Sequence, residues 1–179
     1  MTAEQYLVWE REQPERHEYY RGDVFAMAGG TPRHNALDAA VTIELGGAPK
    51  GTPCRILSAD QRIIAGEQDH YVYADVSVVC GELELHPGTV DVLSNPHIVV
   101  EVLLKSTEAY DRGLKWEAYR RIPSVQDYLL VPGHMDVCRA PRMALRPLLR
   151  GRRYRRYRRK LGRASPAAAA RRRDVYSRR

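Results

Sequence analysis

The feature that most limits how this chain can fold is an abrupt change in composition near residue 138. Residues 139–179 contain 17 Lys and Arg against one acidic residue, a net charge of +16, whereas residues 1–138 contain 12 basic and 21 acidic residues, a net charge of −9. The basic segment includes RRYRRYRRK and SPAAAARRR and has few large apolar side chains. Such a composition cannot offset the entropy lost on ordering. We therefore expect one folded domain over residues 1–138.

The basic tail over residues 139–179 has three interpretations. Its tyrosines and arginines suit a nucleic-acid-binding arm, in which rings stack on bases and guanidinium groups neutralise phosphates. It can also be disordered without a role. Finally, Arg, Ala, Pro and Gly are the residues that GC-rich DNA yields out of frame, so the tail can be an aberrant product of a frame error. The sequence leaves these interpretations open.

The remaining composition is that of an ordinary globular protein. The 179 residues are 44% apolar and 28% charged, and no window is apolar enough for a spanning helix, nor does the start resemble a signal peptide. We expect a cytoplasmic protein. Cys54, Cys80 and Cys138 form no CxxC pair, which favours reduced, buried thiols over a disulfide framework.

The pattern of apolar residues predicts alternating helices and strands. Helices are expected over residues 3–12, 32–46 and 106–121, with Thr2 and Thr31 as caps, and a hairpin over residues 17–27. Further strands are expected at 54–58, 62–65, 71–80, 98–104, 125–131 and 135–138. One helix joins the strands at 98–104 and 125–131, which favours parallel pairing through a right-handed crossover. The predicted fold class is therefore α/β or α+β, with a mixed sheet flanked by helices.

Two carboxylates interrupt strands that are otherwise apolar enough to be buried. Asp75 lies in the run at 71–80 and Glu101 in the run at 98–104. A buried carboxylate costs several kcal/mol unless it is paired or binds a metal. If the two strands are neighbours, both acids could bind one cation, and oxygen-only ligands suit Mg²⁺ or Mn²⁺. Alternatively, each acid faces solvent or pairs with an Arg or Lys.

The helix that follows Glu101 places Asp111 and Lys115 on one face, four residues apart. They can form an ordinary surface ion pair, worth a fraction of a kcal/mol. Alternatively, Lys115 reaches back to the strand and stabilises negative charge on a phosphate during its hydrolysis.

An ordered series of motifs over roughly residues 1–138 resembles the Uma family, within the PD-(D/E)XK restriction-endonuclease-like superfamily. The motifs are Glu18 with Gly22 and Asp23, His34, residues 73–79, residues 100–103 with Ser106 and Thr107, Asp111 with Lys115 and Tyr119, and residues 125–131. The resemblance implies a nuclease core that uses a divalent metal.

The resemblance also implies roles for individual residues. Asp75 and Glu101 correspond to the metal-binding acids, and Glu18 and His34 are weaker candidates for completing the catalytic site. Leu103 stands where the superfamily has its lysine, so Lys115 becomes the candidate for a lysine that has moved to the next helix. The sequence departs from the family at Ala74, which replaces a proline, and at Leu104 and Lys105, which replace Ser-Pro. Lys105 is therefore a second candidate for the catalytic lysine.

These features predict an endonuclease that uses Mg²⁺ or Mn²⁺ and hydrolyses phosphodiester bonds of nucleic acid, with DNA expected rather than RNA. No membrane partner is expected, and a homodimer is left open. The alternative is that the protein is not an enzyme but a catalytically silent nuclease-fold domain that binds nucleic acid or acts as an assembly module.

Overall fold

A computed structural model describes residues 1–27, 29–46, 54–66 and 70–137; the predicted tail lies outside these residues. The helices are α1 (Ala3–Glu10), α2 (Pro32–Gly46), α3 (Glu108–Tyr110), the π-helical segment η1 (Asp111–Lys115) and α4 (Trp116–Tyr119). The strands are β1 (His17–Tyr20), β2 (Asp23–Ala26), β3 (Cys54–Leu57), β4 (Arg62–Ile64), β5 (His70–Tyr73), β6 (Val76–Cys80), β7 (Val92–Leu93), β8 (Ile98–Leu103) and β9 (Asp127–Pro132). Within the described residues, no helix is long and apolar enough to span a bilayer.

The described strands form two sheets. One has the order β2-β1-β5-β4-β7 and the other the order β3-β6-β8-β9. The predicted parallel pair is confirmed, since β8 and β9 run parallel from Ile98 opposite Asp127 to Leu103 opposite Pro132. The mixed, layered α/β fold class is also confirmed, although the sequence predicted one sheet where the structure has two.

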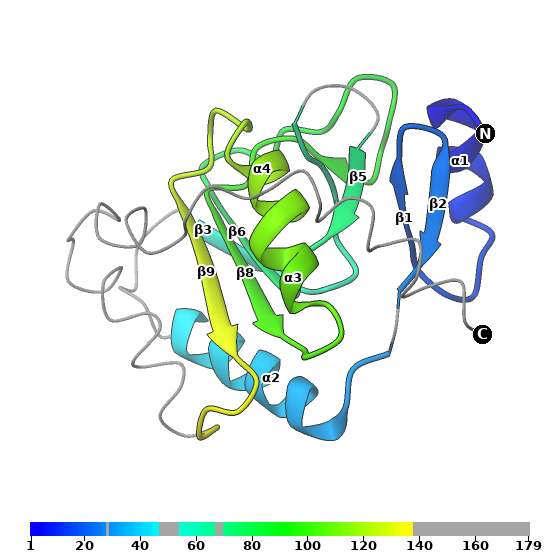
Figure 1. The fold of residues 1–179 in the computed structure, drawn as a ribbon. Coiled ribbons are helices and arrows are strands. Elements are labelled where there is room, and N and C mark those ends of the chain that lie inside the picture. Colours follow the sequence, from blue (N-terminus) through cyan, green and yellow to red (C-terminus); the bar gives the residue numbers. More distant parts are fainter. Residues whose placement is uncertain (28, 47–53, 67–69, 138–179) are drawn as a thin grey trace.

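Helices cover both faces of the β3-β6-β8-β9 sheet (Figure 1). Val100 and Val102 of β8 pack with residues of α2, whereas Val99 and Leu103 pack with residues of α4. Because side chains alternate along a strand, Glu101 lies on the α4 side of the sheet. The burial of both faces explains why β6, β8 and β9 are nearly continuous apolar runs, whereas the edge strand β3 is partly exposed.

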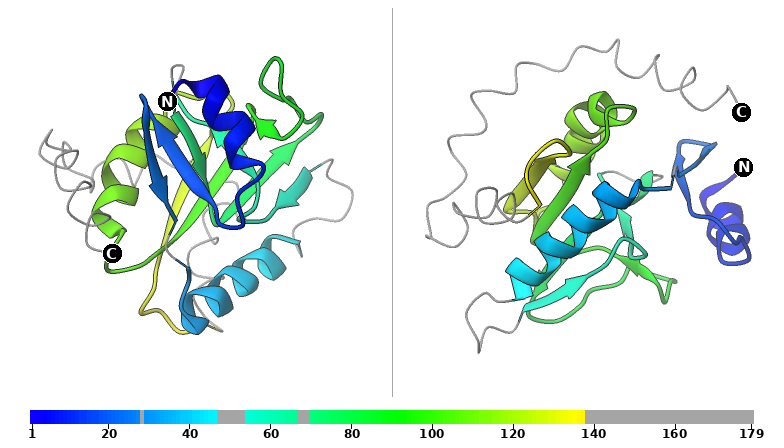
Figure 2. Two further views of the ribbon diagram at one scale, coloured as in Figure 1. Left: turned by 90° about the vertical axis from the view of Figure 1, so that its right-hand side faces the viewer. Right: turned by 90° about the horizontal axis from the view of Figure 1, so that it is seen from below.

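The N-terminal elements form as their local sequence predicts. Thr2 and Gln5 make a reciprocal capping box at the start of α1, and Arg21 and Gly22 both have positive φ values, 47° and 96°, in the turn between β1 and β2. Such a turn matches the twist of paired strands. Helix α1 and this hairpin lie together at one side of the molecule (Figure 2), where Tyr6 of α1 packs against Tyr19 and Tyr71.

The single strand predicted over residues 71–80 is wrong, because the chain bends at Asp75. Strand β5 ends at Tyr73 and belongs to one sheet, and β6 begins at Val76 and belongs to the other. An apolar run gives no sign of such a bend, since residues on both sides of it are buried. The bend places Asp75 at the junction of the two sheets.

The helix predicted over residues 106–121 is shorter and contains a π-helical segment. Regular helix spans only Glu108–Tyr110 and Trp116–Tyr119, with η1 between them. Thr107 makes no side-chain cap bond; its hydroxyl instead donates to Asp111 Oδ2 at 3.0 Å. Single π turns inside helices are frequent at functional sites.

The expectation of reduced, buried cysteines is wrong for two of the three. Cys54 and Cys80 form a disulfide, Cys54 is exposed, and Cys138 lies outside the described residues. The two cysteines are directly opposite each other in the antiparallel β3–β6 pair. That pairing joins segments 26 residues apart, and cysteine spacing alone does not reveal it.

The C-terminal end of the described chain also differs from the prediction. Residues 135–137 form no strand, whereas the short strand β7, which was not predicted, pairs parallel with β4. Residues after β9 are instead held by Arg33, whose guanidinium donates to the carbonyl oxygens of Gly133, His134 and Met135.

Gly133 is expected to be intolerant of any side chain. A Cβ at this position would collide with the backbone carbonyl oxygen of Leu103, at the point where β8 leads toward the η1 segment. Forcing extra atoms into a packed site costs about 1–3 kcal/mol. Gly133→Ala should therefore lower the melting temperature by several degrees, as measured by circular dichroism. Gly29→Ala, at a glycine that has no neighbouring atom within 4 Å and no positive φ, provides the control, and an unchanged melting temperature for Gly133→Ala would contradict this packing.

Candidate active site

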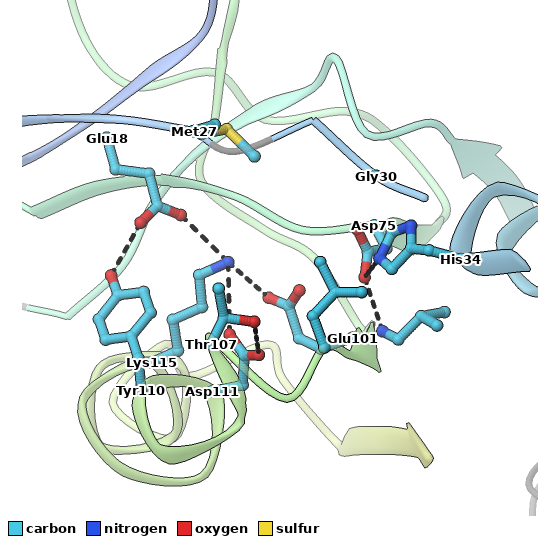
Figure 3. A pocket seen from close by; sticks show the side chains of 12 residues that line it. Glu18, Met27, Gly30, His34, Asp75, Glu101, Thr107, Tyr110, Asp111 and Lys115 are labelled. Atoms are coloured by element: carbon cyan, nitrogen blue, oxygen red, sulfur yellow. Dashed lines mark hydrogen bonds and ion pairs between the residues drawn. The ribbon is translucent and has the colours of Figure 1, made fainter. Parts of the chain in front are cut away.

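A pocket of about 70 Å³ brings together acidic and basic side chains from β1, α2, β8 and η1 and from the bend between β5 and β6 (Figure 3). Strand β1 and the residues after β2 form one side, and α3 and η1 form the opposite side. The lining residues are Glu18, Met27, Gly30, His34, Asp75, Glu101, Val102, Leu104, Thr107, Tyr110, Asp111 and Lys115.

Lys115 lies at the centre of this pocket. Its Nζ atom contacts Glu18 Oε1 at 3.0 Å and Glu101 Oε1 at 3.1 Å, and Asp111 Oδ1 lies 3.9 Å away. Nζ also donates to the carbonyl oxygen of Tyr73 at 2.8 Å. The side chain is almost completely buried, so these groups replace the water that an ammonium ion normally binds.

Electrostatics keep Lys115 charged. Burial alone would lower the pKa of Lys115, but the negative charges of Glu101, Glu18 and Asp111 outweigh burial and raise this pKa well above its ordinary value. Burial raises the pKa of Glu101 well above its ordinary value, and the Lys115 charge opposes this only in part. Burial likewise raises the pKa of Asp111 to about 6. The pocket therefore holds more carboxylates than one lysine can balance.

Asp75 lies beside this cluster and is held by two groups. Its Oδ2 atom accepts a hydrogen bond from the backbone N–H of Val102 at 2.6 Å and lies 3.3 Å from Nε2 of His34. The hydrogen bond from His34 to Asp75 raises the pKa of His34. Asp75 precedes β6, and Val102 belongs to β8, the strand that pairs with β6. The hydrogen bond from Val102 N–H therefore extends this pairing, with the Asp75 carboxylate as the acceptor instead of a backbone carbonyl.

The structure brings together all the site residues predicted from the sequence except one. Asp75, Glu101, Lys115, Glu18 and His34 all line the pocket. Lys105 does not line it, and its side chain is exposed in the turn after β8. Of the two candidate lysines, only Lys115 contacts the acidic residues. The catalytic roles of these residues remain predictions.

Three residues at the site were not predicted to belong to it. Tyr110 donates to Glu18 Oε2 at 3.0 Å, and its ring lies 5.6 Å from Lys115 Nζ. Tyr119 donates to Glu101 Oε1 at 3.3 Å, and Thr107 binds Asp111 as described above. For Thr107 and Tyr119 the available signal was spacing, because Thr107, Asp111, Lys115 and Tyr119 follow one another at intervals of four residues, and such positions share one helix face.

Two carboxylate oxygens at the site are available to a cation. Within the described residues, no hydrogen bond or ion pair engages Asp75 Oδ1 or Glu101 Oε2. The same residues contain no group of three or more His, Cys, Asp and Glu side chains arranged to hold a metal ion. Any cation here would thus have two protein carboxylates as ligands.

Asp38 of α2 should make the stability of the protein dependent on pH. Burial and the nearby charge of Asp75 raise the pKa of Asp38 to about 6, and among the described residues its Oδ1 atom has no hydrogen-bond partner. An acid with a raised pKa in the folded state is protonated preferentially there, so its ionisation between about pH 4 and 6 lowers stability. Asp38→Asn removes this penalty.

Urea unfolding should therefore find Asp38→Asn as stable as the parent near pH 4 and more stable above pH 6, by about 1 kcal/mol because partial exposure screens the charge. Asp60→Asn, at an aspartate whose side chain is 77% exposed, is the control. A constant difference between Asp38→Asn and the parent across this range would show that Asp38 does not ionise as expected.

The chain shares its fold with a solved structure. The chain superposes with a TM-score of 0.54 and 16% identity on a crystal structure from Anabaena variabilis titled "a putative nuclease belonging to DUF820", over 72% of each chain. A family model described as "Uma2: Putative restriction endonuclease" matches residues 3–171. The chain therefore belongs to the Uma2 family, as its motifs indicated.

Two relatives from Synechocystis sp. are also similar over most of their length. The chain is 38% identical over 131 residues to the uncharacterized protein slr1290, covering 73% of this chain and 68% of the relative. It is 30% identical over 135 residues to the uncharacterized protein sll1609, covering 73% of this chain and 74% of the relative.

Proposed function

We propose that this protein is a divalent-metal-dependent endonuclease that hydrolyses phosphodiester bonds of nucleic acid, DNA rather than RNA. The observation that carries the proposal is the direct contact of buried Lys115 with Glu101, next to Asp75, in one pocket. The description of the family, "Putative restriction endonuclease", supports both the reaction and DNA as the substrate.

The donor set of the pocket suits Mg²⁺ or Mn²⁺. Asp75 Oδ1 and Glu101 Oε2 would hold the ion, and Mg²⁺ in proteins is commonly held by one or two carboxylates, with water and substrate phosphate oxygens as the remaining ligands. When Glu18, Asp75, Glu101, Asp111, Lys115 and His34 are all ionised, these lining residues carry a net charge of −2. A divalent cation would balance that charge. Without a cation, a buried site reduces its negative charge by protonation of carboxylates.

In the proposed reaction, the cation and the residues of the pocket would have different roles. A bound cation supplies Lewis-acid chemistry, polarising the phosphate and lowering the pKa of a water molecule. Lys115 places a fixed positive charge where negative charge develops on the phosphate. Glu18 and Asp111 hold the Lys115 ammonium in position, and Val102 N–H and His34 hold the Asp75 carboxylate.

The test is to incubate the purified protein with plasmid DNA, single-stranded DNA and RNA, with and without MnCl₂ or MgCl₂. We expect cleavage of DNA that EDTA abolishes. In parallel, either metal should raise the free energy of unfolding by about 2.7 kcal/mol at a hundredfold excess over its dissociation constant. Absence of both cleavage and metal stabilisation would instead support the catalytically silent nucleic-acid-binding or assembly module.

A further inference from the structure

The proposed catalytic groups are deeply recessed. Glu18 is 2%, Glu101 3%, Asp111 4% and Lys115 5% exposed, and the pocket above them has a volume of about 70 Å³. A cavity needs roughly 10–15 Å³ by this measure for one water molecule, so the pocket has room for a few waters or one phosphate group. It has no room for a base pair.

The sides of the pocket offer surfaces for a base rather than for additional phosphates. Met27 and Tyr110 lie on opposite sides of the pocket (Figure 3), and Leu104 adds another apolar side chain. Among the described lining residues, Lys115 and His34 are the basic ones, and both are already in contact with carboxylates. Thioether and aromatic groups next to a site can pack against the face of an unpaired base.

Charge also disfavours a duplex at this site. Duplex DNA carries one negative charge per roughly 1.7 Å and is bound mainly through Lys and Arg side chains that neutralise its phosphates. Residues 1–138, which include all the residues of the site, carry a net charge of −9. A single strand has a lower charge density than a duplex and is repelled less, and stacking of its bases on aromatic side chains adds binding energy that tolerates any sequence.

We propose that this site cleaves single-stranded DNA, including unpaired segments of a duplex, and excludes paired DNA. This inference rests on the proposed function. An unpaired strand can place one phosphodiester in the recess while a neighbouring base rests against Met27 or Tyr110, whereas the rigid backbone of a duplex holds the phosphate away from Lys115 and Glu101.

The test measures cleavage by the full chain in MnCl₂ of one oligonucleotide in three forms: single-stranded, fully paired, and paired except for a central bubble. Bis(4-nitrophenyl) phosphate, a small phosphodiester without bases, is measured alongside. We expect kcat/KM for the single strand to exceed that for the duplex on the order of tenfold or more, and cuts in the third substrate to fall within the bubble. Cleavage is measured rather than binding, because a tail with a net charge of +16 would attract the phosphates of either form of DNA.

Each outcome gives a decision. Hydrolysis of the small diester together with equal cleavage of duplex and single strand overturns the strand preference and leaves the proposed function standing. No hydrolysis of any substrate overturns both the strand preference and the proposed function.

A substitution in the wall of the pocket tests the preference directly. Met27→Ala widens the pocket and should reduce the preference for the single strand several-fold. The matched change Val90→Ala, at a residue that is 82% exposed and does not line the pocket, should leave the ratio of single-strand to duplex cleavage unchanged.

Discussion

Replacing Lys115 with alanine is expected to lower kcat for metal-dependent cleavage by about 10²–10³-fold, the usual effect of removing one group that stabilises charge in a transition state. Lys115 is buried and contacts Glu101 and Glu18 directly. Lys105, the second lysine near the site in sequence, is exposed. Lys105→Ala is therefore the matched control, and its kcat should equal that of the parent.

Loss of folding would also lower the rate, so stability has to be measured on the same samples. Removing one partner of a buried ion pair costs about 3–5 kcal/mol, and Lys115→Ala leaves three carboxylates without their cation. Lys115→Met keeps the length and volume of the side chain and provides a second variant. Native circular dichroism with parental cleavage rates in either Lys115 variant would show that Lys115 has no catalytic role.

The acidic residues of the site could be predicted because each breaks a strong pattern. Asp75 and Glu101 interrupt apolar runs, and a carboxylate in such a run requires a partner. The parallel crossover from β8 to β9 then makes the helix between them return over the strand, so Lys115 could be placed near Glu101. Lys115 and Lys105 could not be separated from the sequence, because the direction of a side chain depends on where the helix begins.

Features that depend on pairing between distant segments could not be predicted. The Cys54–Cys80 disulfide follows from the β3–β6 register, and a register shifted by one residue would put the two cysteines on opposite faces. The bend at Asp75 arises because β5 and β6 join different sheets. One continuous buried strand and two buried strands separated by a bend have the same apolar sequence pattern, so the pattern does not reveal the bend. The π-helical segment was not predicted either; in the structure, the backbone carbonyl of Asp111 accepts a hydrogen bond from Tyr128 of β9, a contact between distant residues that local sequence does not reveal.

Glu101→Gln is expected to abolish metal-dependent cleavage while leaving the protein as stable as the parent or more stable. Glutamine has the same shape, and its Oε1 atom can still accept from Lys115 and Tyr119, as Glu101 does. Burial raises the pKa of Glu101 well above its ordinary value, so at pH 7 the ionised form carries a penalty that the neutral amide avoids. The anionic oxygen that would bind the cation is lost.

Cleavage should fall by at least about 10²–10³-fold, and MnCl₂ should no longer stabilise Glu101→Gln against urea. Glu117→Gln, at a partly exposed glutamate of α4 paired with Arg120, is the control and should keep both properties. A substitution that raises the free energy of unfolding and abolishes activity identifies a residue that is retained for function although it lowers stability. If Glu101→Gln instead unfolds readily and MnCl₂ still stabilises its folded fraction, Glu101 is a structural partner of Lys115 and the cation binds elsewhere.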